Sequence, residues 1–128
     1  MPIYLKRVAR ANPQNRTQVK FYPSVKTLRQ VPEKEVAKLV ADETTLNPKE
    51  AEMAIQQYQK ILTRFLLDSN SVQLGDWGSF HLTCSSEGVE QEANVNPAQV
   101  KGYKVQFTPG KELRNALRDA HGKMFDTL

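Results

Sequence analysis

The sequence predicts an α+β fold with a helical base, a small antiparallel sheet that carries an arm, and a short C-terminal helix. An added β-hairpin is expected at the N-terminus. Two patterns predict these elements: apolar side chains recur at helical spacing over residues 51–66, and they alternate with polar ones over residues 18–22 and 103–107. The 128 residues are enough for one compact domain and too few for two ordinary ones.

The N-terminal segment, residues 1–31, is strongly basic. Residues 3–9 and 18–22 are expected to be strands, with Asn12-Pro13 marking a turn within residues 10–16. The segment has no acid and seven bases, which are Lys6, Arg7, Arg10, Arg16, Lys20, Lys26 and Arg29. Such a hairpin suits a polyanion partner, or it is an added sheet edge whose charges keep it unpaired.

A first helix is expected to begin near Pro32, because proline is favoured at a helix start and acidic Glu33 and Glu35 complement the positive end of the helix dipole. Its apolar face is expected to consist of Val36, Leu39 and Val40. The helix is expected to end within residues 42–45.

The second helix has the clearest start signal in the chain. Asn47 is an N-cap residue, Pro48 takes the first helical position, and Glu50 completes a capping box. Its apolar stripe consists of Ala51, Ala54, Ile55, Tyr58, Ile61, Leu62, Phe65 and Leu66. Such a stripe is usually ordinary core, but this one is broader than the short first helix can cover. We therefore expect a second copy of the chain to pack on it.

The remaining strands are expected to form a three-stranded antiparallel sheet. Residues 71–74 and 78–84 are two predicted strands with a tight turn between them, and residues 103–107 are the third. Residues 85–92 are polar and acidic and are expected to form a loop or projection. Trp77, in the tight turn, is either a core anchor or an exposed stacking surface.

The C-terminal helix is expected to open at Thr108-Pro109-Gly110-Lys111 and to be closed by Gly122 at its C-cap. Its apolar residues are Leu113, Ala116, Leu117 and Ala120. A packed tail is expected to include Met124, Phe125 and Leu128.

An enzyme is the contrary hypothesis, and the sequence gives it no support. His81 and Cys84 are three positions apart in a predicted strand, so their side chains should face opposite ways and cannot act as a nucleophile–base pair. Without Cys/His metal spacing or a glycine-rich phosphate loop, we expect no metal, cofactor or small-molecule substrate. A single cysteine and the lack of a signal peptide or membrane segment favour a cytoplasmic protein with no membrane partner.

Two phrases of the sequence follow each other at a compatible spacing: Val72-Gln73-Leu74-Gly75-Asp76-Trp77-Gly78-Ser79-Phe80 and Phe107-Thr108-Pro109-Gly110-Lys111-Glu112-Leu113. They resemble V-x-L-x-G-F-G-S-F and F-x-P-G-K-x-L of the HU and integration host factor family of bacterial DNA-binding proteins. Residues 46–51 are similar to the beginning of the family's second helix, and the likeness covers residues 33–120. The hairpin before it resembles the extension of a divergent HU-like branch typical of Bacteroides relatives.

The resemblance implies an HU-like domain over residues 32–128, preceded by the extension of residues 1–31. It implies an intertwined homodimer whose long helices interlock beneath a β-saddle, with two β-arms that reach around double-stranded DNA. The function would be architectural, largely sequence-nonspecific DNA binding in the nucleoid, without enzymatic activity. The alternative is a dimeric scaffold or protein-interaction module that has lost tight DNA binding.

The candidate DNA contacts are transferred from the matching positions. Gly78 and Ser79 match the family's turn, where backbone N–H groups and a hydroxyl lie close to phosphate. Lys111 matches the lysine of the P-G-K phrase, at a helix N-terminus that favours an anion. Arg114 and Arg118 would extend this basic strip, unless these bases are only a solvated helix face.

The arm, residues 81–106, departs from the family pattern. Family arms are rich in Arg and Lys and carry an R-N-P-x-T-G tip, whereas this arm has three acids, which are Glu87, Glu90 and Glu92. Asn96-Pro97 is its only Asn-Pro pair, and Lys101 and Lys104 follow only on the return strand. In the family, an apolar residue of the arm inserts into a base step of the DNA. Since phosphate repels an acidic arm, deep insertion of Pro97 in this way is not expected.

Two further expectations follow from these departures. The N-terminal hairpin is hypothesised to replace the arm as a DNA-contacting element, through Lys6, Arg7, Arg10, Arg16 and Lys20. Asp76 stands where the family has glycine, and because aspartate tolerates a left-handed turn, the geometry of the family's turn can survive this change.

Overall fold

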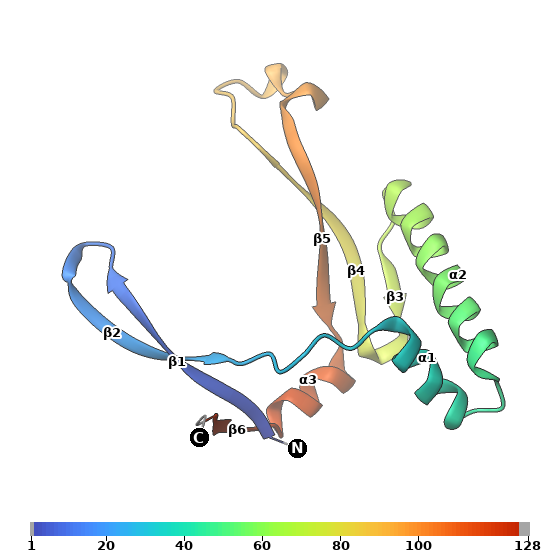
Figure 1. Cartoon of the computed structure of the whole chain (residues 1–128). Helices are drawn as coiled ribbons and strands as arrows, with labels where there is room; N and C mark the ends of the chain where they lie inside the picture. The colour runs from blue at the N-terminus through green and yellow to red at the C-terminus, as the bar shows by residue number, and fades with distance from the viewer. Residues whose placement is uncertain (1, 126–128) are drawn as a thin grey trace. The chain divides into compact units, whose positions relative to one another are not determined.

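The computed structural model describes residues 2–125, and these fall into two compact units (Figure 1). Residues 33–115 form one unit, and the described residues before and after them form the other. Among these residues, none of the helices combines the length and the apolar character needed to cross a membrane.

The first unit begins with two packed helices, α1 (Glu33–Asp42) and α2 (Pro48–Leu67). The predicted start of α2 is confirmed. The Asn47 side chain accepts a hydrogen bond from the Glu50 N–H at 2.8 Å, and the Asn47 N–H donates to Glu50 Oε1 at 3.2 Å. This reciprocal pair satisfies two backbone donors at the helix start.

Small side chains form the contact between α1 and α2. Ala37, Ala41 and Ala51 are buried, and Val40 and Ile55 pack against them. Residues three and four positions apart share a helix face, which brings Ala37, Val40 and Ala41 together. Val36 and Leu39, from the expected apolar face of α1, are exposed in the single chain.

A three-stranded antiparallel sheet follows, with the order β3 (Val72–Leu74), β4 (Gly78–Ser86) and β5 (Val100–Pro109). The one-turn helix η1 (Gly75–Trp77) makes the expected tight turn between β3 and β4. The left-handed residue is Gly75, with φ of 53°, and not Asp76. The turn is therefore kept with Asp76 in the family's glycine position, because the neighbouring glycine adopts the left-handed conformation at no steric cost.

Beyond the end of β3, β4 and β5 continue as a two-stranded arm (Figure 1). The end of the arm contains two short turns of 3-10 helix, η2 (Glu92–Asn94) and η3 (Pro97–Gln99). The helix α3 (Lys111–Arg118) follows β5.

The second unit is a sheet with the order β2-β1-β6. The strands β1 (Pro2–Asn12) and β2 (Asn15–Val25) form an antiparallel hairpin, and β6 (His121–Met124) pairs with β1 in parallel. The hairpin turn is only Pro13-Gln14, shorter than the expected residues 10–16. Asn12 Oδ1 closes it by accepting the Gln14 N–H at 3.0 Å.

The end of the C-terminal helix was predicted wrongly. The helix stops at Arg118, and Gly122 lies in β6 beside Leu5 rather than at a C-cap. The strand β6 pairs with β1 at the opposite end of the chain, so no local sequence pattern predicts that residues 121–124 form a strand. Phe125 packs edge-on against Tyr4 with ring centres 5.5 Å apart, while Leu128 lies outside the described residues.

Candidate nucleic-acid interface

One face of the β3-β4-β5 sheet is polar and has no acidic residue. Strand register pairs Ser79 with Thr108, His81 with Gln106, and Thr83 with Lys104, and alternate residues of a strand share a face. The full polar face consists of Gln73, Ser79, His81, Thr83, Ser85, Lys104, Gln106 and Thr108. Hydroxyl, amide and basic groups together form a surface that can approach a polyanion without repelling it.

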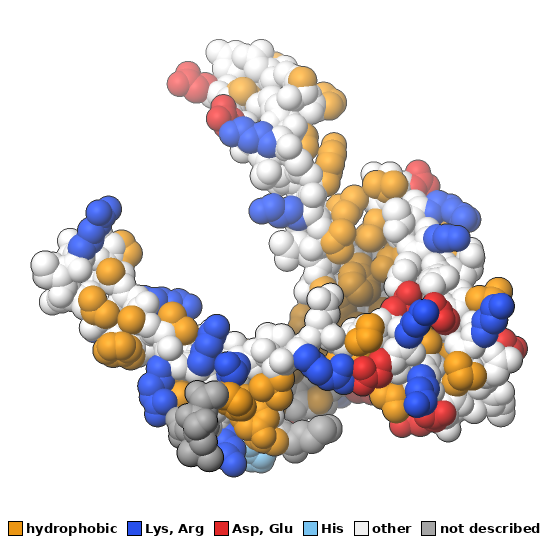
Figure 2. Space-filling view, viewed as in Figure 1, with side chains coloured by type: hydrophobic (Ala, Val, Ile, Leu, Met, Phe, Trp, Pro, Cys, Tyr) orange, Lys and Arg blue, Asp and Glu red, His pale blue; other side chains and the backbone are white. Residues whose placement is uncertain are grey.

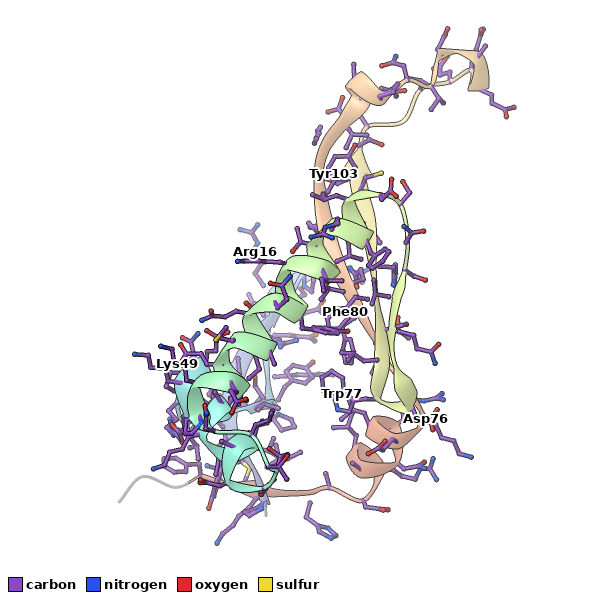
Figure 3. The ribbon with its side chains drawn as sticks, turned by 90° about the vertical axis from the view of Figure 1, so that its right-hand side faces the viewer. Arg16, Lys49, Asp76, Trp77, Phe80 and Tyr103 are labelled. Atoms are coloured by element: carbon purple, nitrogen blue, oxygen red, sulfur yellow. The ribbon has the colours of Figure 1, made fainter. Side chains whose placement is uncertain are left out.

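The opposite face of the sheet is apolar. Its cross-strand pairs are Phe80 with Phe107, Leu82 with Val105, and Cys84 with Tyr103. The Phe107 ring lies 4.8 Å from that of Trp77 and 4.9 Å from that of Phe80, and Figure 3 shows Trp77 and Phe80 on the side of the sheet that faces α2. Packing on this side leaves the polar face available for binding.

Gly78 and Ser79 lie at the start of β4, the central strand of this sheet, in a hollow of about 280 Å³ that Pro109 and Gly110 also line. Gly78 is buried, and a Cβ added to it would overlap the Phe107 ring and lie 2.7 Å from the Thr108 carbonyl oxygen. Packing alone therefore requires glycine at position 78. Ser79, at the start of the polar face, is half-buried and also lines the hollow.

The start of α3 lies next to this hollow. The Gly110 N–H donates to the Trp77 carbonyl oxygen at 2.7 Å, which ties the turn before α3 to the turn before β4. Lys111 is the first residue of α3 and is exposed, as are Arg114 and Arg118. Spacings of three and four residues align these bases along one side of the helix, and the free N–H groups of its first turn favour an anion.

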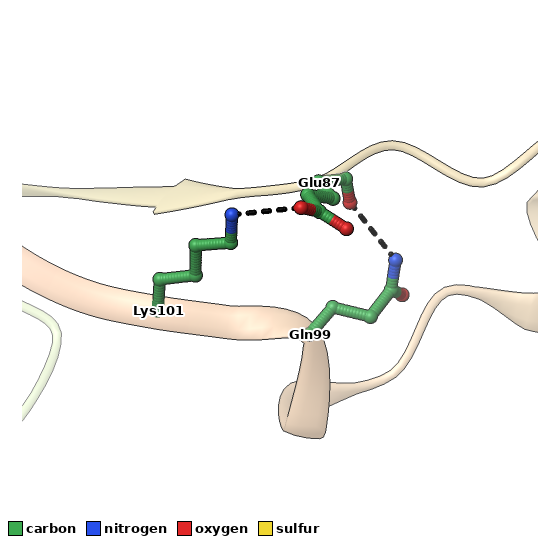
Figure 4. Close-up of polar contacts among 3 residues, drawn as sticks. All are labelled: Glu87, Gln99 and Lys101. Atoms are coloured by element: carbon green, nitrogen blue, oxygen red, sulfur yellow. Dashed lines mark hydrogen bonds and ion pairs between the residues drawn. The ribbon is translucent and has the colours of Figure 1, made fainter.

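Lys101 and Lys104, the two bases of the arm, differ in their surroundings. Lys101 Nζ forms an ion pair with Glu87 Oε1 at 2.8 Å, and the Gln99 side chain donates to the Glu87 carbonyl oxygen at 3.1 Å (Figure 4). The pair is solvent-exposed, at 61% and 81% for the two side chains, so it is a weak interaction that phosphate can replace. Lys104 lies on the polar sheet face, across from Thr83.

The end of the arm is fixed by local hydrogen bonds. Asn96 Oδ1 accepts the Ala98 N–H at 2.9 Å, and the Asn96 N–H donates to Gln99 Oε1 at 2.7 Å. This capping box holds Pro97 as the first residue of η3. Glu87, Glu90 and Glu92 are all exposed close to it in sequence.

The basic hairpin has two different faces. Its register places Tyr4, Lys6, Val8 and Arg10 of β1 on the same face as Lys20, Tyr22 and Ser24 of β2. Arg7 points to the other face, which it shares with apolar residues such as Phe21 and Val25. Figure 2 shows Lys and Arg side chains along this unit. The structure thus groups Lys6, Arg10 and Lys20 but separates Arg7 from them.

Sequence reasoning missed several residues of the polar sheet face. His81, Gln106, Thr108 and Gln73 were not among the candidate contacts, although they share the face with Ser79 and Lys104. Period-two alternation along residues 79–85 and 102–108 was the available signal. Register between β4 and β5 was also needed to bring the two halves of the face together.

Comparison with known proteins agrees with this architecture. A family described as "HU domain fused to wHTH, Ig, or Glycine-rich motif" (HU-HIG) matches residues 1–123. A structure of a candidate bacterial DNA-binding protein from Bacteroides vulgatus ATCC 8482 has a TM-score of 0.64 at 17% identity, over 98% of this chain and 49% of that one. The Anabaena HU–DNA cocrystal structure has a TM-score of 0.55 at 18% identity, over 70% of this chain and 99% of that one. No curated protein matches.

The paired helices, the three-stranded sheet with its arm, and the helix after β5 define an HU-like α+β protein. More specifically, the chain belongs to the HU-HIG family. It spans about half the length of the Bacteroides vulgatus protein that it resembles. At these identities the two solved structures establish the fold, and what they bind is a property of those proteins.

Proposed function

We propose that the chain binds double-stranded DNA without enzymatic activity, as a homodimer with an architectural role in the nucleoid. The observation that carries this proposal is the acid-free polar face of the sheet, bordered by the basic start of α3. The proposed contacts are Gly78, Ser79, Lys101, Lys104, Lys111, Arg114 and Arg118, with Lys6, Arg7, Arg10, Arg16 and Lys20 of the hairpin. Its neighbours in structure include an HU protein crystallised with DNA, which supports the same conclusion.

The chemistry of the polar face favours binding with little sequence preference. Hydroxyl groups, lysines and helix N-termini suit phosphate oxygens, and phosphate contacts position a protein on DNA without reading bases. Pro97 is held in η3, a few residues after the exposed Glu90 and Glu92 in the sequence, and acidic neighbours disfavour its insertion into a base step. We therefore assign DNA contact to the sheet, α3 and the hairpin rather than to the end of the arm.

Homodimerisation is supported by how little apolar surface a single chain buries. Among residues 2–125 only Ala37, Ala41, Ala51 and Leu66 are buried hydrophobics, and no large side chain is fully buried. Phe65 keeps 49% of its surface exposed, and a hollow of about 700 Å³ separates the end of α2 from β4 and β5. Protein interiors are close-packed, so this surface needs a partner. Figure 2 shows hydrophobic side chains open beside α2 and the arm.

The decisive experiment is charge reversal at the start of α3. We expect Lys111→Glu/Arg114→Glu to weaken duplex binding by about tenfold or more, because two phosphate contacts become repulsive. Acidic residues near a helix N-terminus are favourable, so the helix should persist. Lys34→Glu/Lys38→Glu on α1 makes the same change in net charge and should retain more affinity. An equal loss of duplex affinity in both variants would show that α3 is not part of the interface.

A dimeric scaffold without tight DNA binding is the second candidate, and the acidic end of the arm favours it. The two functions differ in their response to salt. Phosphate neutralisation predicts that log K falls linearly with log salt, by about 0.9 per contact. A weak and flat response, measured by fluorescence anisotropy on a duplex, would favour the scaffold.

A further inference from the structure

Tyr22 lies on the basic face of the hairpin and is open to solvent. It is diagonal to Arg10 across the two strands, and Arg10 Cζ is 5.6 Å from the centre of its ring. At this distance the cation is attracted to the ring, yet 42% of the Tyr22 surface remains exposed. The ring is therefore held in place and still accessible to a ligand.

Arg10 also lies directly opposite Lys20 in the hairpin register. Like charges at opposed positions of neighbouring strands destabilise the pairing. Residues 1–31 contain no acid that could offset this repulsion. An anion bound between the two cations would remove the conflict, and phosphate has a geometry that guanidinium groups recognise well.

These three side chains line one hollow. Its volume is about 500 Å³, and its other lining residues, Ala11, Asn12 and Pro13, belong to the end of β1 and the turn. Asn12 is fixed there, since its Nδ2 donates to Gln18 Oε1 at 3.3 Å and its Oδ1 accepts the Gln14 N–H. The hollow thus offers an aromatic surface, two cations and room for a planar heterocycle.

We propose that this hollow binds an unpaired base of single-stranded DNA, with the base against Tyr22 and Arg10 and an adjacent phosphate between Arg10 and Lys20. Aromatic rings in a basic groove bind single strands in this way, because an unpaired base exposes a π-face that stacking within a duplex hides. The inference rests on the proposed function for the class of ligand. It adds a binding preference that the polar sheet face does not provide.

The test compares the full-length protein on a labelled oligodeoxythymidylate and on a duplex of matched length. Tyr22→Ala should weaken binding to the single strand by about 5-fold to 150-fold, because one stacked base is lost. Duplex binding should be unchanged. Tyr22→Phe retains the ring and should bind the single strand as the original protein does.

Phe21→Ala is the matched control. Phe21 is the next residue along β2, faces the other side of the hairpin and is 73% exposed, so its loss perturbs the same strand without touching the hollow. The proposal is overturned if Tyr22→Ala binds the single strand normally, or if Phe21→Ala loses as much affinity. Thermal unfolding of each variant checks that the hairpin unit is intact.

A photocrosslink gives a readout that a purely structural role of Tyr22 would not produce. An oligonucleotide carrying 5-iodouracil should form its adduct on the peptide that contains Tyr22, and an adduct only elsewhere contradicts the proposal. If the unmodified protein binds duplex but no single strand, only this inference fails. If it binds the single strand but no duplex, only the proposed function fails.

Discussion

Gly78 and Gly110 illustrate how single residues join the two halves of the candidate interface. A Cβ at position 78 would overlap the Phe107 ring, and one at position 110 would overlap the Asp76 carbonyl group. The two turns therefore pack backbone against backbone, and the hydrogen bond from Gly110 to Trp77 closes the contact. This explains why two phrases about thirty residues apart both need glycine.

Replacing Gly78 by alanine should destabilise the protein by about 1–3 kcal/mol, because the backbone around Thr108 leaves no room for the methyl group. Urea denaturation monitored by circular dichroism measures this loss. Gly102→Ala, in β5 of the same sheet, is the control, since nothing lies within 4 Å of its added Cβ. It should be neutral or stabilise by up to about 1 kcal/mol. Similar losses in both variants would contradict the packing argument.

The hairpin shows how one element can carry two chemistries on two faces. Alternate residues of β1 and their partners in β2 collect Lys6, Arg10 and Lys20 on one face, while Val19, Phe21 and Val25 lie exposed on the other. A two-stranded hairpin is marginally stable alone. Pairing of β6 with β1 extends it to three strands, so β1 carries the proposed contacts Lys6 and Arg10 and also supports the sheet.

Neutralising the basic face, with Lys6→Gln/Arg10→Gln/Lys20→Gln, should therefore reduce DNA affinity without removing the strand that β6 requires. The salt dependence of binding should become shallower by about 0.9 for each phosphate that the hairpin no longer neutralises. Anisotropy titrations over a range of salt concentrations measure the slope. The helix variant Lys34→Gln/Lys38→Gln/Lys60→Gln removes the same charge, and an equally reduced slope there would assign the effect to net charge alone.

For the molecule as a whole, the described residues 2–125 bury few large apolar side chains. The buried residues between α1 and α2 are alanines, and larger apolar side chains of α2, Phe65 and Leu67 among them, remain exposed. Burial of apolar side chains is the main source of stability. A second copy that covers α2 would supply the missing burial.

The variant Phe65→Asp tests whether a second copy of the chain covers the exposed apolar side chains of α2. If a partner copy covers Phe65, the aspartate places an unpaired charge in the interface, and we expect dissociation or a loss of roughly 3 kcal/mol of stability or more. Sedimentation equilibrium over a range of protein concentrations reports the oligomeric state. Gln57→Asp, at an exposed polar position of α2, adds the same charge and should leave the dimer intact. If the unsubstituted protein is itself a monomer in solution, homodimerisation is refuted.

The elements whose signals are local could be predicted from the amino-acid sequence alone. The capping box at Asn47 and Glu50, the alternation in β4 and β5, and the turn at Gly75 depend on residues within a few positions of one another. The two glycine-containing phrases, residues 72–80 and 107–113, indicated the family because each is also a short local pattern. Helix starts and strand alternation follow from local backbone geometry. That geometry favours particular residue types within a few positions, so a short segment is enough to reveal it.

Features that depend on pairing between distant segments of the chain required the three-dimensional structure. Only the register between β4 and β5 brings His81 to Gln106, and only the register of the hairpin places Lys20 opposite Arg10. The strand β6 was missed because its hydrogen-bond partner lies more than one hundred residues away in the sequence. Which charges of different strands share a surface is a property of strand pairing, and neither composition nor local periodicity encodes that pairing.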